Sequence, residues 1–251
     1  MIFISAGCRE LTDEVVNFEL SSGGLVWSGN ARPIPQVRAG FIDFVDIPFT
    51  KGWVQIKGEL AYGKFMDNDF LRDHYNYYNQ YITTDALCHH KSISFRSNPD
   101  KPFVVTIGAE LAAQFGGTKR YYEKGILIDS LTMKSPTRLK DFFKILFPSS
   151  GDGQTNEGDQ AYYYGNHVGQ WNLSAEYRFK DNSSVRGYFE WYFDDASGMG
   201  KFNGWDGLWG LEYKSGKKNW LSNVVLEYLD MTNQSGPLNW CPSDYNDPKL
   251  D

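Results

Sequence analysis

The adjacent histidines His89 and His90 are the first residues to consider for chemistry, because imidazole can ligate a metal or act as a general base. They lie in a stretch of alternating polar and apolar residues, which predicts a β-strand. Successive side chains of a strand point to opposite faces, so the two rings cannot share one ion. The sequence also has no G-x-S-x-G elbow, and Gly116-Gly117 lacks phosphate-loop spacing. We expect no catalytic residues, no metal, no cofactor and no enzyme activity.

Charged residues form a second group, and they fall on the polar faces of the expected strands. We interpret them as the lining of a barrel interior, where they pair across neighbouring strands and hydrate the lumen. Most are expected to be structural and a minority to contact a ligand. The lumen candidates are Lys57, Glu59, Glu110, Glu176, Arg178, Arg186, Glu190, Glu212 and Glu227.

Aromatic residues in the long connections are the candidates for binding a sugar. A ring can stack on the CH face of a pyranose, while neighbouring Asn, Asp and Gln side chains bind its hydroxyls. The alternative is that these rings form an outer girdle or pack the loops together. The glycan candidates are Tyr75, Tyr77, Tyr78, Tyr163 and Trp205, and Tyr81, Tyr162 and Tyr164 accompany them.

The elements that must position these residues are β-strands. Alternation is clearest in the two arms that flank Asp181-Asn182-Ser183, where Trp, Leu, Tyr and Phe alternate with charged and polar residues from Trp171 to Asp194. Each arm has about the 9–11 residues that a tilted strand needs to cross a bilayer. Further strands are predicted near 36–45, 53–65, 86–96, 102–114, 206–214 and 219–231, with weaker candidates at 2–7 and 14–27.

The connections between these strands alternate in length. From residue 46 onward they are short (46–52), long (66–85), short (97–101), long (115–168), short (181–183), long (195–205), short (215–218) and long again from 232. Outer-membrane barrels have tight periplasmic turns and extended outer loops, and Trp171, Phe189, Trp191 and Phe193 suit their aromatic girdles. The alternative is a soluble lipocalin-like barrel or β-sandwich with its apolar face turned inward.

Composition agrees with a barrel and excludes other classes. Aromatic residues make up 16% of the chain, and its mean hydropathy is −0.49. No run of the sequence approaches the roughly 20 apolar residues that a membrane helix needs. The net charge of −6 argues against nucleic acid as a partner. The cysteines Cys8, Cys88 and Cys241 are too dispersed for a zinc site or a disulfide framework.

One helix is predicted, at about 136–147 in the longest connection. Ser135 can cap it, Pro136 suits its first turn, and Pro148 ends it. Leu139, Phe142, Phe143 and Leu146 form its apolar stripe. It is too short to cross a bilayer, so we expect a lid or plug at the barrel mouth; an ordinary surface helix is the alternative.

The two ends of the chain lack the features of a complete exported protein. No Lys or Arg precedes the apolar residues Ile2–Ile4, and the C-terminal stretch is rich in Pro, Asp and Asn. We therefore read residues 1–251 as a single partial all-β domain, an antiparallel transmembrane β-barrel with one short loop helix.

Several local stretches resemble the capsule assembly (Wzi-like) family of outer-membrane barrels, in its Bacteroidetes-type form. The resemblance is spread over most of the chain. It implies a barrel of about eighteen strands, within the range of bacterial barrels, with helical elements at the mouth. The stretches are Ser28–Gln36, Gly58–Gly63, His89–Ser92 with Phe95-Arg96, Gly108–Gly117 and Asn233–Pro237.

This resemblance implies a lectin-like role, in which a monomeric barrel in the outer membrane of a Gram-negative bacterium holds capsular or exopolysaccharide at the cell surface. Polysaccharide and outer-membrane lipid are then the expected partners. Measured against this family, we expect the chain to be incomplete, without the export signal and many of the strands. Two alternatives remain open, a porin-like or substrate-transport channel and a soluble carbohydrate-binding β-domain.

Overall fold

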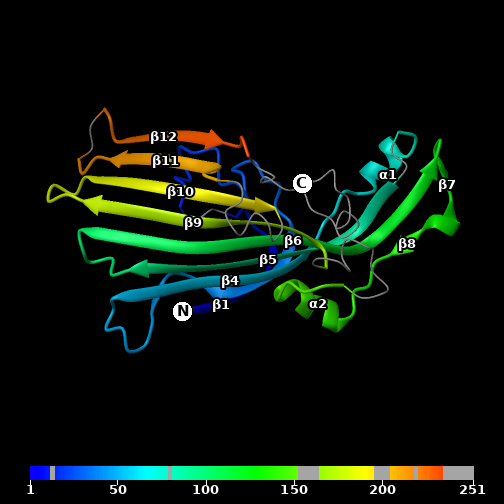
Figure 1. Cartoon of the computed structure of the whole chain (residues 1–251), viewed down its shortest axis with the longest axis horizontal. Helices are drawn as coiled ribbons and strands as arrows, with labels where there is room; N and C mark the ends of the chain where they lie inside the picture. Colours follow the sequence, from blue (N-terminus) through cyan, green and yellow to red (C-terminus); the bar gives the residue numbers. More distant parts are fainter. Residues whose placement is uncertain (12–14, 79–80, 152–163, 195–203, 218–219, 234–251) are drawn as a thin grey trace, which may run out of the picture.

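The computed structural model describes residues 1–11, 15–78, 81–151, 164–194, 204–217 and 220–233 (Figure 1). Strands dominate these residues, so the all-β prediction is confirmed. They form one antiparallel sheet in the order β1-β2-β4-β5-β6-β9-β10-β11-β12, with three short strands off this path. Within the described residues β1 and β12 end the path and do not pair with each other, so the sheet is open.

The strands match most of the predicted positions. The predicted segment 36–45 divides into β2 and the short β3, whereas β5 and β6 extend well beyond the predicted limits. The strands are β1 (Ile2–Cys8), β2 (Pro35–Phe41), β3 (Val45–Asp46), β4 (Val54–Lys64), β5 (Tyr81–Ser97), β6 (Phe103–Glu123), β7 (Ile126–Leu127), β8 (Met133–Lys134), β9 (Asn166–Arg178), β10 (Ser184–Asp194), β11 (Gly207–Lys214) and β12 (Asn223–Asp230). The helices are α1 (Phe70–Tyr75), the 3₁₀ turn η1 (Asp129–Leu131) and α2 (Leu139–Leu146).

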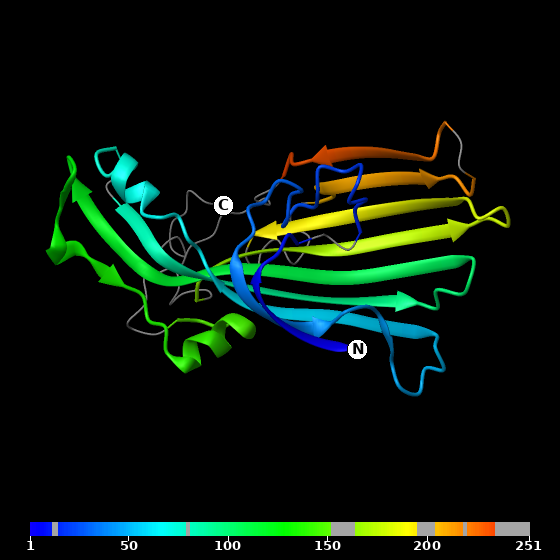
Figure 2. The same ribbon diagram turned by 180° about the vertical axis from the view of Figure 1, so that it is seen from behind.

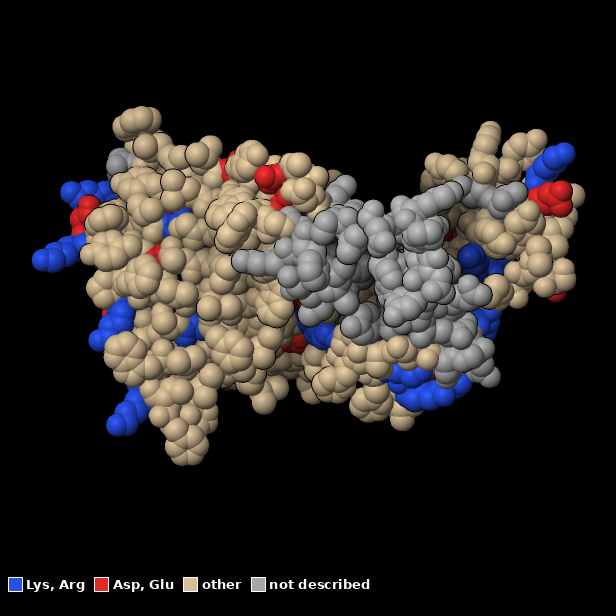
Figure 3. Space-filling view, in the orientation of Figure 1, with Lys and Arg blue, Asp and Glu red and all other residues tan. Residues whose placement is uncertain are grey.

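The two faces of the sheet have the reverse of the burial found in water-soluble proteins. Ile107 is 50% exposed, whereas Glu190 on the opposite face is fully buried at 0% exposure. The exposed face carries large apolar side chains, and in Figure 3 few charged atoms interrupt the surface over these strands. It includes Ile93, Phe95, Phe103, Leu173, Tyr177, Leu211, Tyr213, Leu226 and Tyr228. Water normally drives such side chains into a core, so this face requires an apolar environment.

Some aromatic side chains at the strand ends pack on one another. Phe189 is buried against Trp209, with ring centroids 4.1 Å apart. Phe193 lies over Gly169, where a Cβ atom would meet the phenyl ring at 2.5 Å. Phe189 and Phe193 are therefore covered by neighbours, rather than projecting freely as girdle residues.

Helix α2 begins later than predicted and lies on the unexpected side of the sheet. Its N-cap is Arg138 rather than Ser135, and Asp141 completes a capping box with it. Ile145 packs with Phe115 and Tyr164. Phe115 points to the same side as Ile107, because both are odd-numbered residues of β6. The helix therefore does not lie over the polar face as the expected lid or plug. Across the described residues, no helix is long and apolar enough to span a membrane.

Candidate functional site

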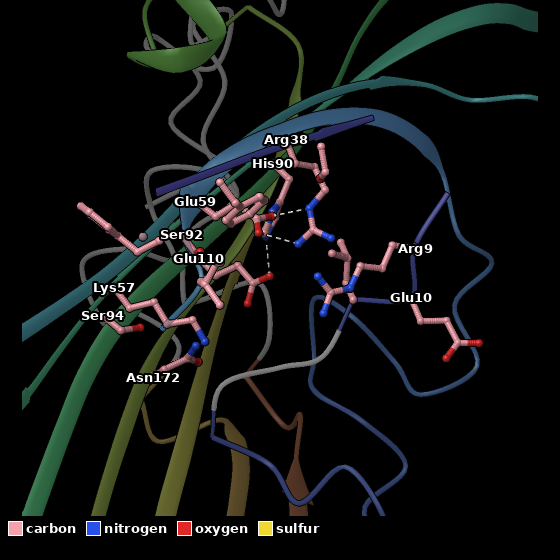
Figure 4. A pocket seen from close by; sticks show the side chains of 16 residues that line it. Arg9, Glu10, Arg38, Lys57, Glu59, His90, Ser92, Ser94, Glu110 and Asn172 are labelled. Atoms are coloured by element: carbon pink, nitrogen blue, oxygen red, sulfur yellow. Dashed lines mark hydrogen bonds and ion pairs between the residues drawn. The ribbon is translucent and has the colours of Figure 1, made fainter. Parts of the chain in front are cut away.

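Four charged side chains from four neighbouring strands meet on the polar face (Figure 4). The guanidinium of Arg38 in β2 donates two hydrogen bonds to Glu59 in β4, from Nε at 2.8 Å and from Nη2 at 2.5 Å. His90 in β5 lies between two acids, with Nε2 2.6 Å from Glu110 Oε1 and Nδ1 3.6 Å from Glu59 Oε1. Antiparallel register produces this cluster, because Ser92 pairs with both Glu59 and Glu110 and His90 shares its face.

A cavity of about 360 Å³ opens beside this cluster and is lined by residues of β1, β2, β4, β5, β6 and β9 and of the segments that follow β1 and β2. Three buried polar atoms at its wall have no hydrogen-bond partner among the described residues, namely Arg38 Nη1, His90 Nδ1 and Asn172 Oδ1. With His90 protonated between two carboxylates, the cavity therefore offers two donors and one acceptor to whatever enters it. Hydroxyl groups can satisfy both kinds, because each one donates and accepts.

A non-strand segment crosses the polar face, and we call residues 15–29 the inserted segment (Figure 2). The backbone N–H of Leu25 donates to Glu190 Oε2 at 2.8 Å, and that of Val26 donates to Gln170 Oε1 at 3.1 Å. The strand predicted over 14–27 is therefore wrong. These N–H groups are satisfied by side chains of the sheet and not by a neighbouring strand.

Strands β10, β11 and β12 hold the rest of the inserted segment on the same polar face. Asn17 Nδ2 donates to Glu212, and Ser21 Oγ donates to Glu227 at 2.7 Å. Val15 and Val16 pack with Tyr188 and Leu208. The inserted segment thus covers part of the polar face, and carboxylates of the sheet anchor it there.

The nine lumen candidates all lie on this polar face, as their register shows. Glu176, Arg186 and Glu212 are cross-strand neighbours, and Arg186 Nη2 lies 2.5 Å from Glu212. Arg178 lies at the end of β9, where it contacts Glu176 and the carbonyl of Pro99. Lys57, Glu59 and Glu110 line the cavity, whereas Glu190 and Glu227 hold the inserted segment.

Sequence reasoning missed Arg38, His90, Gln170 and Asn172. The alternating pattern predicted that His89 and His90 point to opposite faces of the sheet, and this is confirmed. The ring of His89 lies against the ring of Tyr62 on the other face, with the two ring centroids 4.4 Å apart. What the sequence did not reveal was the register that places His90 between two carboxylates.

The structure brings three of the aromatic glycan candidates together near α1 and places Trp205 elsewhere, before β11. Tyr75, Tyr77 and Tyr78 are exposed at and after α1, and the Tyr77 and Tyr78 rings lie 5.6 Å apart. Trp205 precedes β11 and lies 6.1 Å from Trp209. Tyr163 lies outside the described residues. Tyr164, expected beside it in an outer loop, is instead buried against Phe115 and Ile145.

Arg72 in α1 forms ion pairs with Asp69 at 3.1 Å and with Asp73 at 2.9 Å. The hydrogen bond from the Arg72 guanidinium holds the pKa of the Asp73 carboxyl below its ordinary value. Asp73 therefore stays ionised to a lower pH than an isolated Asp, and it lies close in sequence to the exposed tyrosines.

Comparisons with protein-family models, curated proteins and solved structures found no match to this chain. Its function has to be inferred from the geometry of the two faces of the sheet and of the cavity on the polar face.

Proposed function

We propose that this chain forms part of an outer-membrane β-barrel that binds and retains a surface polysaccharide without catalysing a reaction. The reversed burial of the sheet is the observation that supports the membrane assignment. In β6 the apolar face runs from Phe103 through Ile107 to Leu111, about the 9–11 residues of a tilted membrane strand. Lipid would cover this face, while the polar face would enclose the interior.

The lengths of the connections between strands support a proposal for which end of the sheet faces the outside of the cell. The connections at 98–102 and 179–183 are short and lie at one end of the sheet, whereas those carrying α1 and α2 lie toward the other end (Figure 1). In outer-membrane barrels short turns face the periplasm. Helix α1 and its tyrosines would therefore project outside the cell.

Retention fits the interior better than conduction does. A porin keeps a water-filled lumen, whereas here the inserted segment crosses the polar face and hydrogen-bonds to Glu190 and Gln170. The paired charges beside the cavity add hydrogen-bonding groups suited to hydroxyl-rich polymers. Exposed rings such as Tyr77 and Tyr78 offer a stacking surface outside.

Replacing both Tyr77 and Tyr78 with alanine tests the polysaccharide part of this proposal. We expect affinity for the source cell's purified surface polysaccharide to fall roughly tenfold, since two aromatic contacts worth about 0.5–1.5 kcal/mol each would be lost. Binding is measured by isothermal calorimetry on detergent-extracted protein. Phe49→Ala is the matched control, because Phe49 is an exposed ring in the turn before β4. Equal affinities in the parent and the tyrosine variant would contradict this site.

Deleting residues 15–29 tests whether the inserted segment blocks the interior. Cys8 and Pro35 are register partners, so the remaining residues can still connect β1 to β2. We expect the parent protein to show little conductance in planar bilayers and the deletion variant to show large steps, because the anchored segment is gone. A milder variant, Gln170→Ala with Glu190→Ala, should give intermittent openings. A large steady conductance of the parent would favour the channel alternative.

A further inference from the structure

Helix α2 exposes an apolar stripe that points away from the sheet. Leu139 and Phe143 are 77% and 56% exposed, and the C-cap residue Phe147 is 69% exposed. These residues are four apart and therefore share one side of the helix. The opposite side, with Asp141 and Ile145, is buried against the sheet. Surface helices in water normally turn polar residues outward, so the stripe requires a partner.

The orientation of this stripe is fixed by the contacts beneath it. Tyr62 Oη donates to the carbonyl of Phe142 at 3.0 Å. Lys91 Nζ donates to the carbonyl of Ile145 at 3.1 Å and so satisfies the last turn. The stripe therefore cannot rotate toward the sheet without breaking these bonds.

The helix lies where the exposed part of the apolar face ends. Leu60 and Leu111 are the last positions on this face before the residues that α2 covers, and Lys91 pairs with both. The next row contains Tyr62, His89 and Ala113, which the structure places beside and beneath α2. Because α2 is on the same side of the sheet as Ile107, its stripe continues the apolar face at its outer boundary.

Cationic side chains flank the stripe. Lys140 is exposed next to Leu139, Lys144 is half-buried one turn further along, and the acid of this helix, Asp141, is buried beneath Arg138. In Figure 3 Lys and Arg atoms gather beside the position that α2 has in Figure 1. An apolar stripe bordered by lysines fits the boundary between acyl chains and anionic headgroups, where long cationic side chains reach the phosphates.

We propose that α2 is an interfacial helix, whose Leu139–Phe143–Phe147 stripe is buried at the headgroup boundary of an anionic lipid membrane. This inference rests on the proposed membrane assignment of the sheet. The helix would fix the depth of the barrel in the bilayer, because it is clamped to β4 and β5 on one side and to lipid on the other.

Nitroxide labels on the full chain, reconstituted in vesicles of phosphatidylcholine and phosphatidylglycerol, test the proposal. Cysteine is introduced at Phe143, at Ile107 as the lipid reference, or at Tyr78 as the water reference, in a background with Cys8→Ser and Cys241→Ser. Cys88 is buried and is retained. We expect labels at 143 and 107 to collide with oxygen several-fold more often, relative to a water-soluble nickel chelate, than the label at 78.

The two labels separate the possible failures. A lipid signal at 107 with a water signal at 143 would overturn the interfacial role of α2 and leave the membrane assignment intact. A label at 143 that met neither probe would mean that protein covers the stripe, and this outcome would also overturn the interfacial role of α2. A water signal at 107 would overturn the membrane assignment and this inference together.

Discussion

Replacing Ile107 with arginine is expected to prevent stable insertion of the chain into a membrane. Ile107 lies midway along the apolar face of β6, near the expected centre of the bilayer. A lipid-facing arginine at that depth costs about 2–4 kcal/mol, and the membrane-inserted fraction should fall accordingly. The measurement is the amount of protein that stays with the outer membrane after urea extraction.

The same substitution distinguishes the membrane assignment from a water-soluble sheet. Ile107 is half-exposed, and replacing an exposed residue in water changes stability by about 0.5 kcal/mol or less. The matched control is Ile126→Arg, because Ile126 is exposed in the short strand β7, beyond the apolar face. If the Ile107 and Ile126 variants extracted equally, the apolar face would not be in contact with lipid.

The sequence contains enough information for the strands and for their two faces. Alternation depends only on neighbouring residues, so the positions of β4, β9, β10 and β11 were predicted to within a few residues. The same pattern placed Glu110 and Glu212 on the polar face. Their close partners, His90 and Arg186, follow from cross-strand register, which a single sequence does not specify.

Two features were mispredicted because tertiary contacts decide them. Residues 14–27 contain short apolar runs that are typical of a strand, but their N–H groups bind Glu190 and Gln170 across the polar face. The apolar residues of α2 were expected to cover the barrel mouth. Ile145 instead packs beneath the helix on Phe115, and Phe143 points outward. A helical stripe shows that one side needs an apolar partner, and it does not show which surface supplies it.

Replacing His90 with leucine is expected to lower the free energy of unfolding by about 3 kcal/mol. This value is at the lower end of the range for breaking a buried ion pair. The variant removes the 2.6 Å contact to Glu110 and leaves that buried carboxylate without the charge of the imidazole. The cost stays at the low end because Glu59 keeps its two hydrogen bonds from Arg38. Urea unfolding in detergent micelles, followed by tryptophan fluorescence, measures the change.

Three further variants decide whether this cost arises from the His90–Glu110 pair itself: Glu110→Gln alone, Glu110→Gln combined with His90→Leu, and Arg178→Leu. Adding Glu110→Gln to His90→Leu should recover about half of the lost stability, since a neutral amide is less costly to bury than a carboxylate. Arg178→Leu breaks the exposed contact with Glu176 and should cost less than about 1 kcal/mol. If the costs of His90→Leu and Glu110→Gln were simply additive, the two side chains would not be coupled. His90 would then fill space in the interior, and its charge would not hold β5 and β6 together.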